Sequence, residues 1–199
     1  MSKVKEKQAK RRSEIIESLI PLMTSEDFDK ISVSDLCQTA GISIGTFYHY
    51  FTKKSDMLIG LLWIIDEDLK ENTFPLLTNE DEMENLRMFA RGWASYIQSH
   101  GLERSKLISG VNPEGWGNLE KERISFKKIQ EIFEAARKKG QISKRFTVDA
   151  LTDFFLLMLR SVSTDWSRRE GSYDIVKKMD GFTEFFIQGC QSKGNGKTK

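Results

Sequence analysis

Between residues 43 and 54 the chain reads SIGTFYHYFTKK, a stretch rich in side chains that can bind phosphates and bases. The hydroxyls of Thr46 and Tyr48 and the imidazole of His49 can form hydrogen bonds with phosphate oxygens or base edges. Lys53 and Lys54 follow at once and can supply positive charge for neighbouring phosphates. These residue types favour the binding of a nucleic acid.

Five consecutive rings, at residues 47–51, indicate how this stretch lies if it is helical. At about 100° per residue, Phe47, Tyr50 and Phe51 share one arc and are expected to be buried. The opposite, outward face then carries Gly45, Thr46, Tyr48 and His49, with Ile44 at its border. Taken alone, a Tyr-His pair is also typical of an ordinary helix surface, so the flanking elements must decide between the two interpretations.

The rest of the chain shows no arrangement typical of an enzyme. His49 and His100 are the only histidines, and the sequence has no phosphate loop, nucleophile elbow or metal-ligand spacing. Cys37 and Cys190 are too few for a disulfide framework and lack the partners of a zinc site. We therefore expect no catalysis, no metal and no cofactor, and two reduced, packed cysteines.

Composition indicates a soluble globular protein, with 39% hydrophobic and 30% charged residues. No run approaches the roughly 18 apolar residues of a membrane span, and the start MSKVKEKQAKRR lacks the apolar core of a signal peptide. We expect a cytoplasmic protein without membrane segments. With only 3 prolines and apolar residues at helical spacing, the sequence predicts an all-α fold of about nine helices.

Charge is distributed unevenly along the chain, although the net charge is only +2. Residues 1–12 carry +5, residues 191–199 carry +3, and the stretch between them carries −6. A basic arm that leads into a helix suits contact with a polyanion at one end of the molecule. The segment 191–199 is predicted to be a flexible basic tail.

Local signals predict the elements that position the outward face. A first helix is expected at about 5–24, with Pro21 kinking it or marking its end. Ser32 and Asp35 can form a capping box for a short helix, Gly41 can end that helix, and Ser43 can cap the next one. The result is a pair of short helices joined by a tight turn, with the small Cys37 where they approach.

Further helices are predicted downstream from breaks at proline and glycine residues. They are expected at about 54–70, 80–99, 103–109, 118–139, 147–170 and 172–190.

The stretch ISVSDLCQTAGISIGTFYHYFTKKSDML resembles the DNA-binding domain of tetracycline-repressor-like (TetR/AcrR) transcriptional regulators. The resemblance covers about residues 9–69, with the helix-turn-helix motif at 32–51. It implies a three-helix domain whose 44–51 helix enters the major groove. The candidate DNA-binding residues are Ser32, Ser34, Ser43, Ile44, Gly45, Thr46, Tyr48, His49, Lys53 and Lys54.

Two positions depart from the family pattern. Ile44 stands where the family often has a polar or basic residue, so a contact is missing or is replaced by apolar contact with a thymine methyl. Asp27 stands where a glycine commonly precedes the aromatic residue at Phe28, and we expect little consequence because Asp tolerates the same backbone region.

Residues 70–190 are expected to form a larger helical domain for ligand binding and dimerisation. The apolar run at 154–159, FFLLML, surrounds its helix rather than forming a stripe, so it needs cover on two sides. Either an internal core or a second subunit can supply that cover, and the resemblance favours a homodimer through the last two long helices. The resemblance also implies a small-molecule pocket, apolar or aromatic in character, for which the candidates are Phe89, Trp93, Tyr96, Trp116, Phe126, Phe133 and Phe155.

The leading hypothesis is a ligand-responsive transcriptional regulator, most simply a repressor, that binds a palindromic operator as a homodimer and is released by a small-molecule effector. A second hypothesis is an all-helical protein–protein interaction module without DNA binding. A third is a transcriptional activator of the same family, or a sensor of a fatty or acyl compound.

Overall fold

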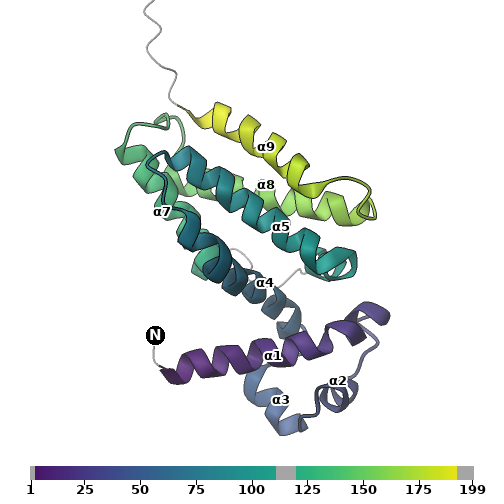
Figure 1. Ribbon diagram of the computed structural model, residues 1–199. Helices are drawn as coiled ribbons and strands as arrows, with labels where there is room; N and C mark the ends of the chain where they lie inside the picture. The colour runs from purple at the N-terminus through teal and green to yellow at the C-terminus, as the bar shows by residue number, and fades with distance from the viewer. Residues whose placement is uncertain (1–2, 111–119, 192–199) are drawn as a thin grey trace, which may run out of the picture.

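The computed structural model describes residues 3–110 and 120–191, and apart from one isolated bridge every regular element in these ranges is a helix. The predicted all-α class is confirmed. Helices α1 (Lys3–Ser25), α2 (Val33–Ala40) and α3 (Ile44–Tyr50) pack together at one end of the molecule (Figure 1). Helix α4 (Asp56–Asp68) leads from this end to the remaining helices. The boundary proposed near residue 69 stays a prediction.

Helix α4 is held tightly against α1. Gly60 lies on the α1 side, where an added Cβ would come within 2.1 Å of the Cδ1 atom of the buried Ile16. The absence of a side chain therefore allows the two helices to approach closely. After Asp68 the helix continues as the π-helix η1 (Leu69–Thr73) and the short 3-10 helix η2 (Phe74–Leu76), so the predicted 54–70 helix is confirmed with a changed ending.

Four long helices form the other end of the molecule: α5 (Glu82–Ser109), α7 (Ile124–Lys138), α8 (Val148–Arg168) and α9 (Ile175–Cys190). The break expected before residue 103 is a single residue, Gly101, whose φ of 82° lies in the left-handed region. The predicted helices at 147–170 and 172–190 correspond to α8 and α9. Trp116 and the tail at 192–199 lie outside the described residues.

The single helix predicted at 118–139 is wrong in its first part. Residues 120–122 are helical, but Arg123 has an extended backbone with ψ of 141°, and α7 begins only after it. The guanidinium of Arg123 forms a buried ion pair with Asp66 of α4. Periodicity along the chain could not anticipate this interruption, because the partner lies 57 residues away.

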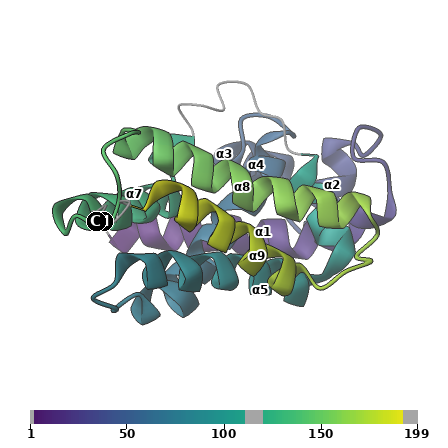
Figure 2. The same cartoon turned by 90° about the horizontal axis from the view of Figure 1, so that it is seen from above.

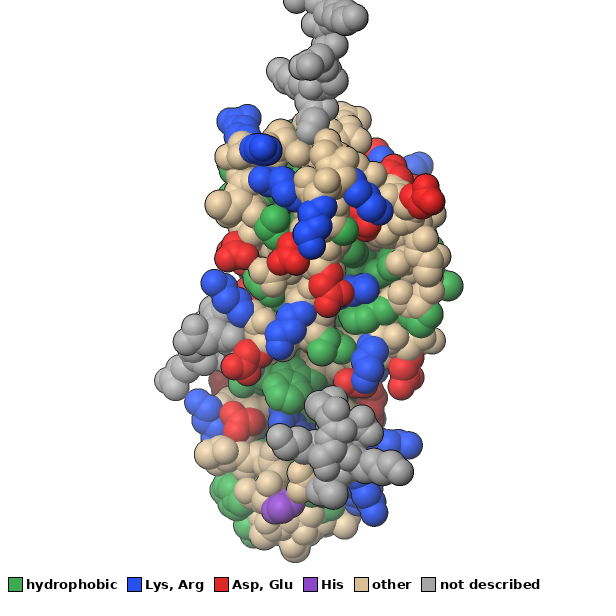
Figure 3. All heavy atoms as spheres, turned by 90° about the vertical axis from the view of Figure 1, so that its left-hand side faces the viewer, with side chains coloured by type: hydrophobic (Ala, Val, Ile, Leu, Met, Phe, Trp, Pro, Cys, Tyr) green, Lys and Arg blue, Asp and Glu red, His purple; other side chains and the backbone are tan. Residues whose placement is uncertain are grey.

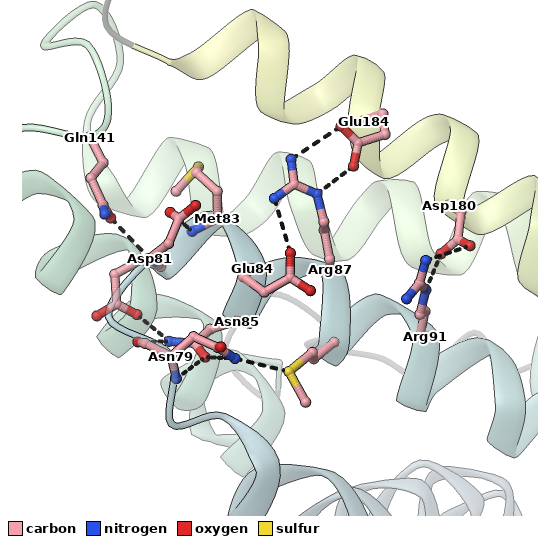
Figure 4. A network of polar contacts seen from close by, with 12 residues as sticks. Asn79, Asp81, Met83, Glu84, Asn85, Arg87, Arg91, Gln141, Asp180 and Glu184 are labelled. Atoms are coloured by element: carbon pink, nitrogen blue, oxygen red, sulfur yellow. Dashed lines mark hydrogen bonds and ion pairs between the residues drawn. The ribbon is translucent and has the colours of Figure 1, made fainter.

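Two arginine–carboxylate pairs fix the orientation of α9 against α5 (Figure 4). Arg87 binds Glu184 through two donors, and Arg91 Nε lies 2.8 Å from Asp180 Oδ1. Hydrogen bonds from Arg87 hold the pKa of Glu184 below its ordinary value. Pairs this exposed contribute about 1 kcal/mol or less each, so their main effect is to determine which face of α9 turns towards α5.

The opposite faces of α8 and α9 are apolar and exposed. Seen from above, these two helices lie nearest the viewer, over α5 (Figure 2). Phe154 and Leu157 of α8 and Phe182 and Phe185 of α9 are all exposed, and Phe185 reaches 79%. Large rings rarely stay this accessible in a monomer, so the surface, which we call the α8–α9 face, is suited to an interface.

Both cysteines are buried and unpaired, as expected. Burial raises the pKa of the Cys190 thiol to about 11 and raises that of Cys37 as well. Across the described residues, none of the helices combines the length and apolar character needed to cross a bilayer.

Candidate nucleic-acid interface and ligand pocket

Helix α2 begins at the predicted capping box. The Ser32 hydroxyl accepts a hydrogen bond from the Asp35 N–H at 3.1 Å, and the Ser32 N–H donates to Asp35 Oδ2 at 2.9 Å. The hydroxyl also donates to the same carboxylate, which lowers the pKa of Asp35. At the other end Gly41 has a φ of 63°, so the predicted left-handed turn is confirmed.

Helix α3 begins at the predicted Ser43 cap. The N–H of Thr46 donates to Ser43 Oγ at 3.0 Å, and the two hydroxyl oxygens lie 2.9 Å apart. This pair satisfies one of the free N–H groups at the helix start and fixes both hydroxyls at the exposed edge. The tight turn and the two caps together set the angle at which α3 leaves α2.

Buried rings anchor α3 from beneath. Phe47 and Phe51 are fully buried, with ring centroids 5.2 Å apart. The expectation for these two rings is confirmed. Tyr50 packs against the core but stays partly exposed, because it lies at the last residue of α3 and carries a polar hydroxyl.

The outward face of α3 is exposed. Ile44 is 54% exposed and Tyr48 55% exposed, Gly45 and His49 are exposed too, and Thr46 is partly buried by its bond to Ser43. In Figure 3 the lowest end of the molecule shows mostly uncharged surface with a histidine among it. A protruding, uncharged and hydrogen-bonding helix of this kind suits insertion into a DNA groove.

Gly45 has no steric reason to be a glycine within this chain. An added Cβ would meet only Ser43 Oγ, at the ordinary contact distance of 3.8 Å. A glycine inside a helix costs about 1 kcal/mol relative to alanine, and the fold gains nothing visible in return. The missing side chain is explained if an external partner approaches the backbone of α3 closely.

Lys54 has a structural role in addition to its assignment to a DNA contact, which stays a prediction. Its ammonium donates to three backbone carbonyls of the connector between α1 and α2: Phe28 O at 2.6 Å, Asp29 O at 3.0 Å and Ile31 O at 3.0 Å. An ammonium has only three donors, so none is left for a phosphate in this arrangement. No local pattern indicated this role, because the three carbonyls lie 23 to 26 residues away from Lys54.

We expect Lys54→Ala to lower the free energy of unfolding by about 2 kcal/mol, because three carbonyls lose a charged donor. Urea unfolding followed by circular dichroism measures the change. The control is Lys30→Ala in the same connector. The Lys30 side chain is 81% exposed in its surface ion pair with Asp27, so its removal should change stability by less than about 0.5 kcal/mol. Equal stabilities for the two variants would contradict the structural role of Lys54.

Ser32 and Ser34 lie at the exposed start of α2. The proton of Ser32 is already donated to Asp35, which leaves this hydroxyl as an acceptor only. Their assignment to DNA contacts, like that of Lys53, stays a prediction.

Most of the predicted pocket residues lie in the closed core. Phe89, Tyr96, Phe126, Phe133 and Phe155 are all buried, and Phe133 and Phe155 meet edge to face with centroids 6.0 Å apart. Burial in the packed core accounts for these five aromatic residues, and their assignment to a ligand site stays a prediction. Trp93 is the described candidate that does line one.

That hollow, which we call the α4–α5–α8 pocket, has a volume of about 440 Å³. Trp93 donates its indole N–H to Ser163 Oγ at 3.1 Å, which fixes the ring in the wall. The lining residues from α4 and α5 are largely apolar and include Leu62, Ile97 and Ile108 beside Trp93. Helix α8 contributes Leu157 together with the charged Arg160 and Arg168, two arginines that the sequence interpretation missed. An arginine directly after the apolar run FFLLML was the available signal.

A buried ion pair connects this region to α4. Arg123 donates to both carboxylate oxygens of Asp66, at 3.1 and 2.6 Å, and to the carbonyl of Leu62 at 3.2 Å. The side chains of Arg123 and Asp66 are only 2% and 6% exposed. Since Leu62 also lines the pocket, Arg123 holds the α4 segment that forms one of the pocket's walls.

Comparison with known proteins finds a family model that matches the N-terminal part of the chain and solved structures that share its fold. Residues 15–61 match the model described as bacterial regulatory proteins, tetR family. The transcriptional regulator AcuR of Cereibacter sphaeroides is 24% identical over 144 residues, a match that spans 67% of this chain and 65% of AcuR, just under two thirds of that relative.

Two solved structures share the fold. FadR from Bacillus subtilis in complex with stearoyl-CoA has a TM-score of 0.73 at 18% identity, covering 88% of this chain and 97% of FadR. AibR in complex with isovaleryl coenzyme A and operator DNA has a TM-score of 0.59 at 16% identity, with the same coverages of 88% and 97%.

Proposed function

Because residues 15–61 match the model of the tetR family of bacterial regulatory proteins, we propose that the chain is a ligand-responsive transcriptional repressor of that family. In this proposal residues 9–69 form the DNA-binding domain and residues 70–190 the regulatory domain. A homodimer binds an inverted-repeat operator and is released by a small-molecule effector. Such a protein acts in the cytoplasm, where bacterial operators lie.

The outward face of α3 is the observation that carries the DNA-binding role. Tyr48 and Ile44 protrude, Thr46 is held by Ser43, and Gly45 leaves the backbone open without an internal reason. Hydroxyl and imidazole groups bind phosphates or base edges, and Ile44 can contact a thymine methyl. Contact with solvent alone does not explain why these side chains occur together on an exposed helix.

The α8–α9 face supports the homodimer. A two-fold partner would cover the exposed rings of α8 and α9 with the same rings of its own chain. It would also present two copies of α3, which should lie roughly 34 to 36 Å apart to read two half-sites on one side of the duplex. A second copy of the chain would bury those apolar residues of the run at 154–159 that face outward.

Effector binding would act through α4. This helix contributes Leu62 to the α4–α5–α8 pocket and packs against α1 through Gly60. A ligand releases the operator only if it binds more tightly to the conformation that does not fit the DNA. The solved neighbours FadR and AibR each hold an acyl-CoA, which makes an acyl compound a candidate effector here as well.

Selection of bound sequences from a random DNA pool tests the DNA-binding role. An inverted repeat among the selected sequences would support both operator recognition and the dimer. Recovery of no sequence above background would instead favour the protein–protein interaction module.

On the selected operator, we expect Tyr48→Phe to weaken binding about fivefold to tenfold, because one hydroxyl contact of roughly 1 kcal/mol is lost. Gel-shift titration at fixed salt measures the affinity. Tyr50→Phe is the matched control, since Tyr50 lies on the inward side of the same helix and should leave affinity unchanged. Equal affinities for the wild type and Tyr48→Phe would count against the assigned face.

The sign of regulation follows from a separate measurement. Transcription from a promoter that contains the operator should fall when the protein is added and recover with effector. A rise in transcription would identify an activator and overturn the repressor assignment.

A further inference from the structure

The α4–α5–α8 pocket differs from the other hollows in its position. Two further hollows lie along the α8–α9 face and include Phe182 and Phe185, so a partner subunit would cover them. Another lies between α1 and α5 and is smaller, at about 370 Å³. Among these four hollows, the α4–α5–α8 pocket is the one lined by residues of α4, α5 and α8 together.

The lining of this pocket combines apolar and charged residues. Leu62, Trp93 and Ile97 of α4 and α5 form what we call the apolar side, and the arginines of α8 form the polar side. The bond from Trp93 to Ser163 fixes the indole ring in place before any ligand arrives. The pocket volume of about 440 Å³ lies within the roughly 300 to 1,000 Å³ of small-molecule sites. The apolar side alone would accept a hydrocarbon chain or a ring system.

The polar side is cationic. Arg160 is partly buried and forms an ion pair with Glu120, and Arg168 lies exposed beside it. Burial lowers the pKa of Arg160, and the nearby positive charge of Arg123 acts in the same direction. Asp165 also lines the pocket, but its carboxylate already accepts bonds from Arg169 and Tyr173. Glu120 forms an ion pair with Arg160, and the negative charge of Asp153 also acts on this guanidinium.

From this arrangement we propose that the α4–α5–α8 pocket binds an amphipathic acid. The apolar part lies along Leu62, Trp93 and Ile97, and the anionic head binds Arg160 in place of Glu120. Arginine binds carboxylates and phosphates in the same forked geometry, so either head group meets this requirement. The proposal deepens the proposed function, on which it rests, by giving the effector a chemical class.

Displacement of Glu120 offers a route from the pocket to the DNA-binding end. The N–H of Arg123 donates to the carbonyl of Glu120 at 3.1 Å, so the two residues belong to one turn. The guanidinium of Arg123 in turn donates hydrogen bonds to Asp66 and to the Leu62 carbonyl of α4. A head group that frees Glu120 from Arg160 therefore loosens the turn that positions Arg123, and α4 can shift against α1.

Calorimetric titration of the full chain without DNA tests the proposal. The probes are decanoate, decyl phosphate and decanoyl-CoA, with decanol as the uncharged counterpart of the same chain length. We expect at least one acid to bind at least about tenfold more tightly than decanol, because a charged hydrogen bond contributes to its affinity. The tightest acid identifies whether the head is a carboxylate, a simple phosphate or a coenzyme.

Arg160→Gln should reduce the affinity for that acid about tenfold or more, to the level of decanol, and leave decanol binding unchanged. The matched control is Arg145→Gln, an exposed arginine outside the pocket that should bind every probe as the wild type does. Arg168→Gln serves as a second variant because its exposed side chain can be replaced without disturbing the fold. It should weaken acid binding about threefold, which remains measurable if Arg160→Gln does not fold.

Equal binding of decanol and all three acids would overturn the proposal, and so would unchanged acid affinity in both arginine variants. Operator affinity measured without any probe separates this failure from failure of the proposed function. A protein that binds its operator but shows no preference for acids refutes only the ligand class. A protein that binds acids at Arg160 but no operator refutes only the regulatory role.

Discussion

Phe185→Glu is expected to convert the protein from a dimer to a monomer and to weaken operator binding by about 100-fold or more. Phe185 is 79% exposed in the single chain, so the new carboxylate would remain solvated there and the fold would be retained. In a dimer the same carboxylate would be buried without a partner, at a cost of several kcal/mol. A monomer reads only one half-site and loses the gain in affinity, roughly 100-fold to 10,000-fold, that comes from binding two linked sites.

Analytical ultracentrifugation measures the oligomeric state, and gel-shift titration measures the affinity. Leu76→Glu is the matched control, because Leu76 is 56% exposed but lies on η2, away from the α8–α9 face. That variant should remain a dimer with unchanged operator affinity. A dimer that persists in Phe185→Glu would show that another surface joins the subunits.

The second large effect concerns the buried pair between Arg123 and Asp66. We expect Arg123→Ala to lower the free energy of unfolding by about 3 to 5 kcal/mol, because it leaves the carboxylate of Asp66 buried without a counter-ion. It also removes the donor that binds the Leu62 carbonyl. Urea unfolding monitored by circular dichroism gives the change, provided that the slope of the transition stays the same as in the wild type.

The double variant Arg123→Met with Asp66→Leu is the control for this prediction. Replacing a buried ion pair by apolar residues of similar volume is often neutral, so the double variant should recover most of the lost stability. Recovery would show that the loss in Arg123→Ala comes from the unpaired charge. A loss below about 1 kcal/mol in Arg123→Ala would instead indicate that water reaches Asp66.

The helix-turn-helix could be predicted from sequence because its signals are local. Ser32 and Asp35 are three residues apart, Ser43 and Thr46 are three residues apart, and Gly41 acts through its own backbone. Helical periodicity alone predicted which aromatic rings of α3 are buried and which are exposed, and only Tyr50 is less buried than expected. The α8–α9 face was likewise visible in the sequence as six apolar residues that no single packing surface could cover.

The pocket and the ion pairs could not be predicted in the same way. Aromatic residues are as suitable for a core as for a ligand site, and five of the described candidates are buried in the core. The true lining includes Arg160, whose partner Glu120 is 40 residues away. No periodicity along the chain relates residues that are so far apart.

Bonds and spacings within a few residues define the helical class, the two capped helices and the face that α3 presents, so these features could be deduced from the sequence. The roles of three charged residues became clear only once the helices were packed: Lys54 stabilises the connector at Phe28, Arg123 interrupts a helix to reach Asp66, and Arg160 lines a pocket. Long charged side chains form hydrogen bonds and ion pairs with the groups that lie close to them in the packed structure. Their roles therefore depend on how elements distant in the sequence are arranged, and local sequence preferences do not specify that arrangement.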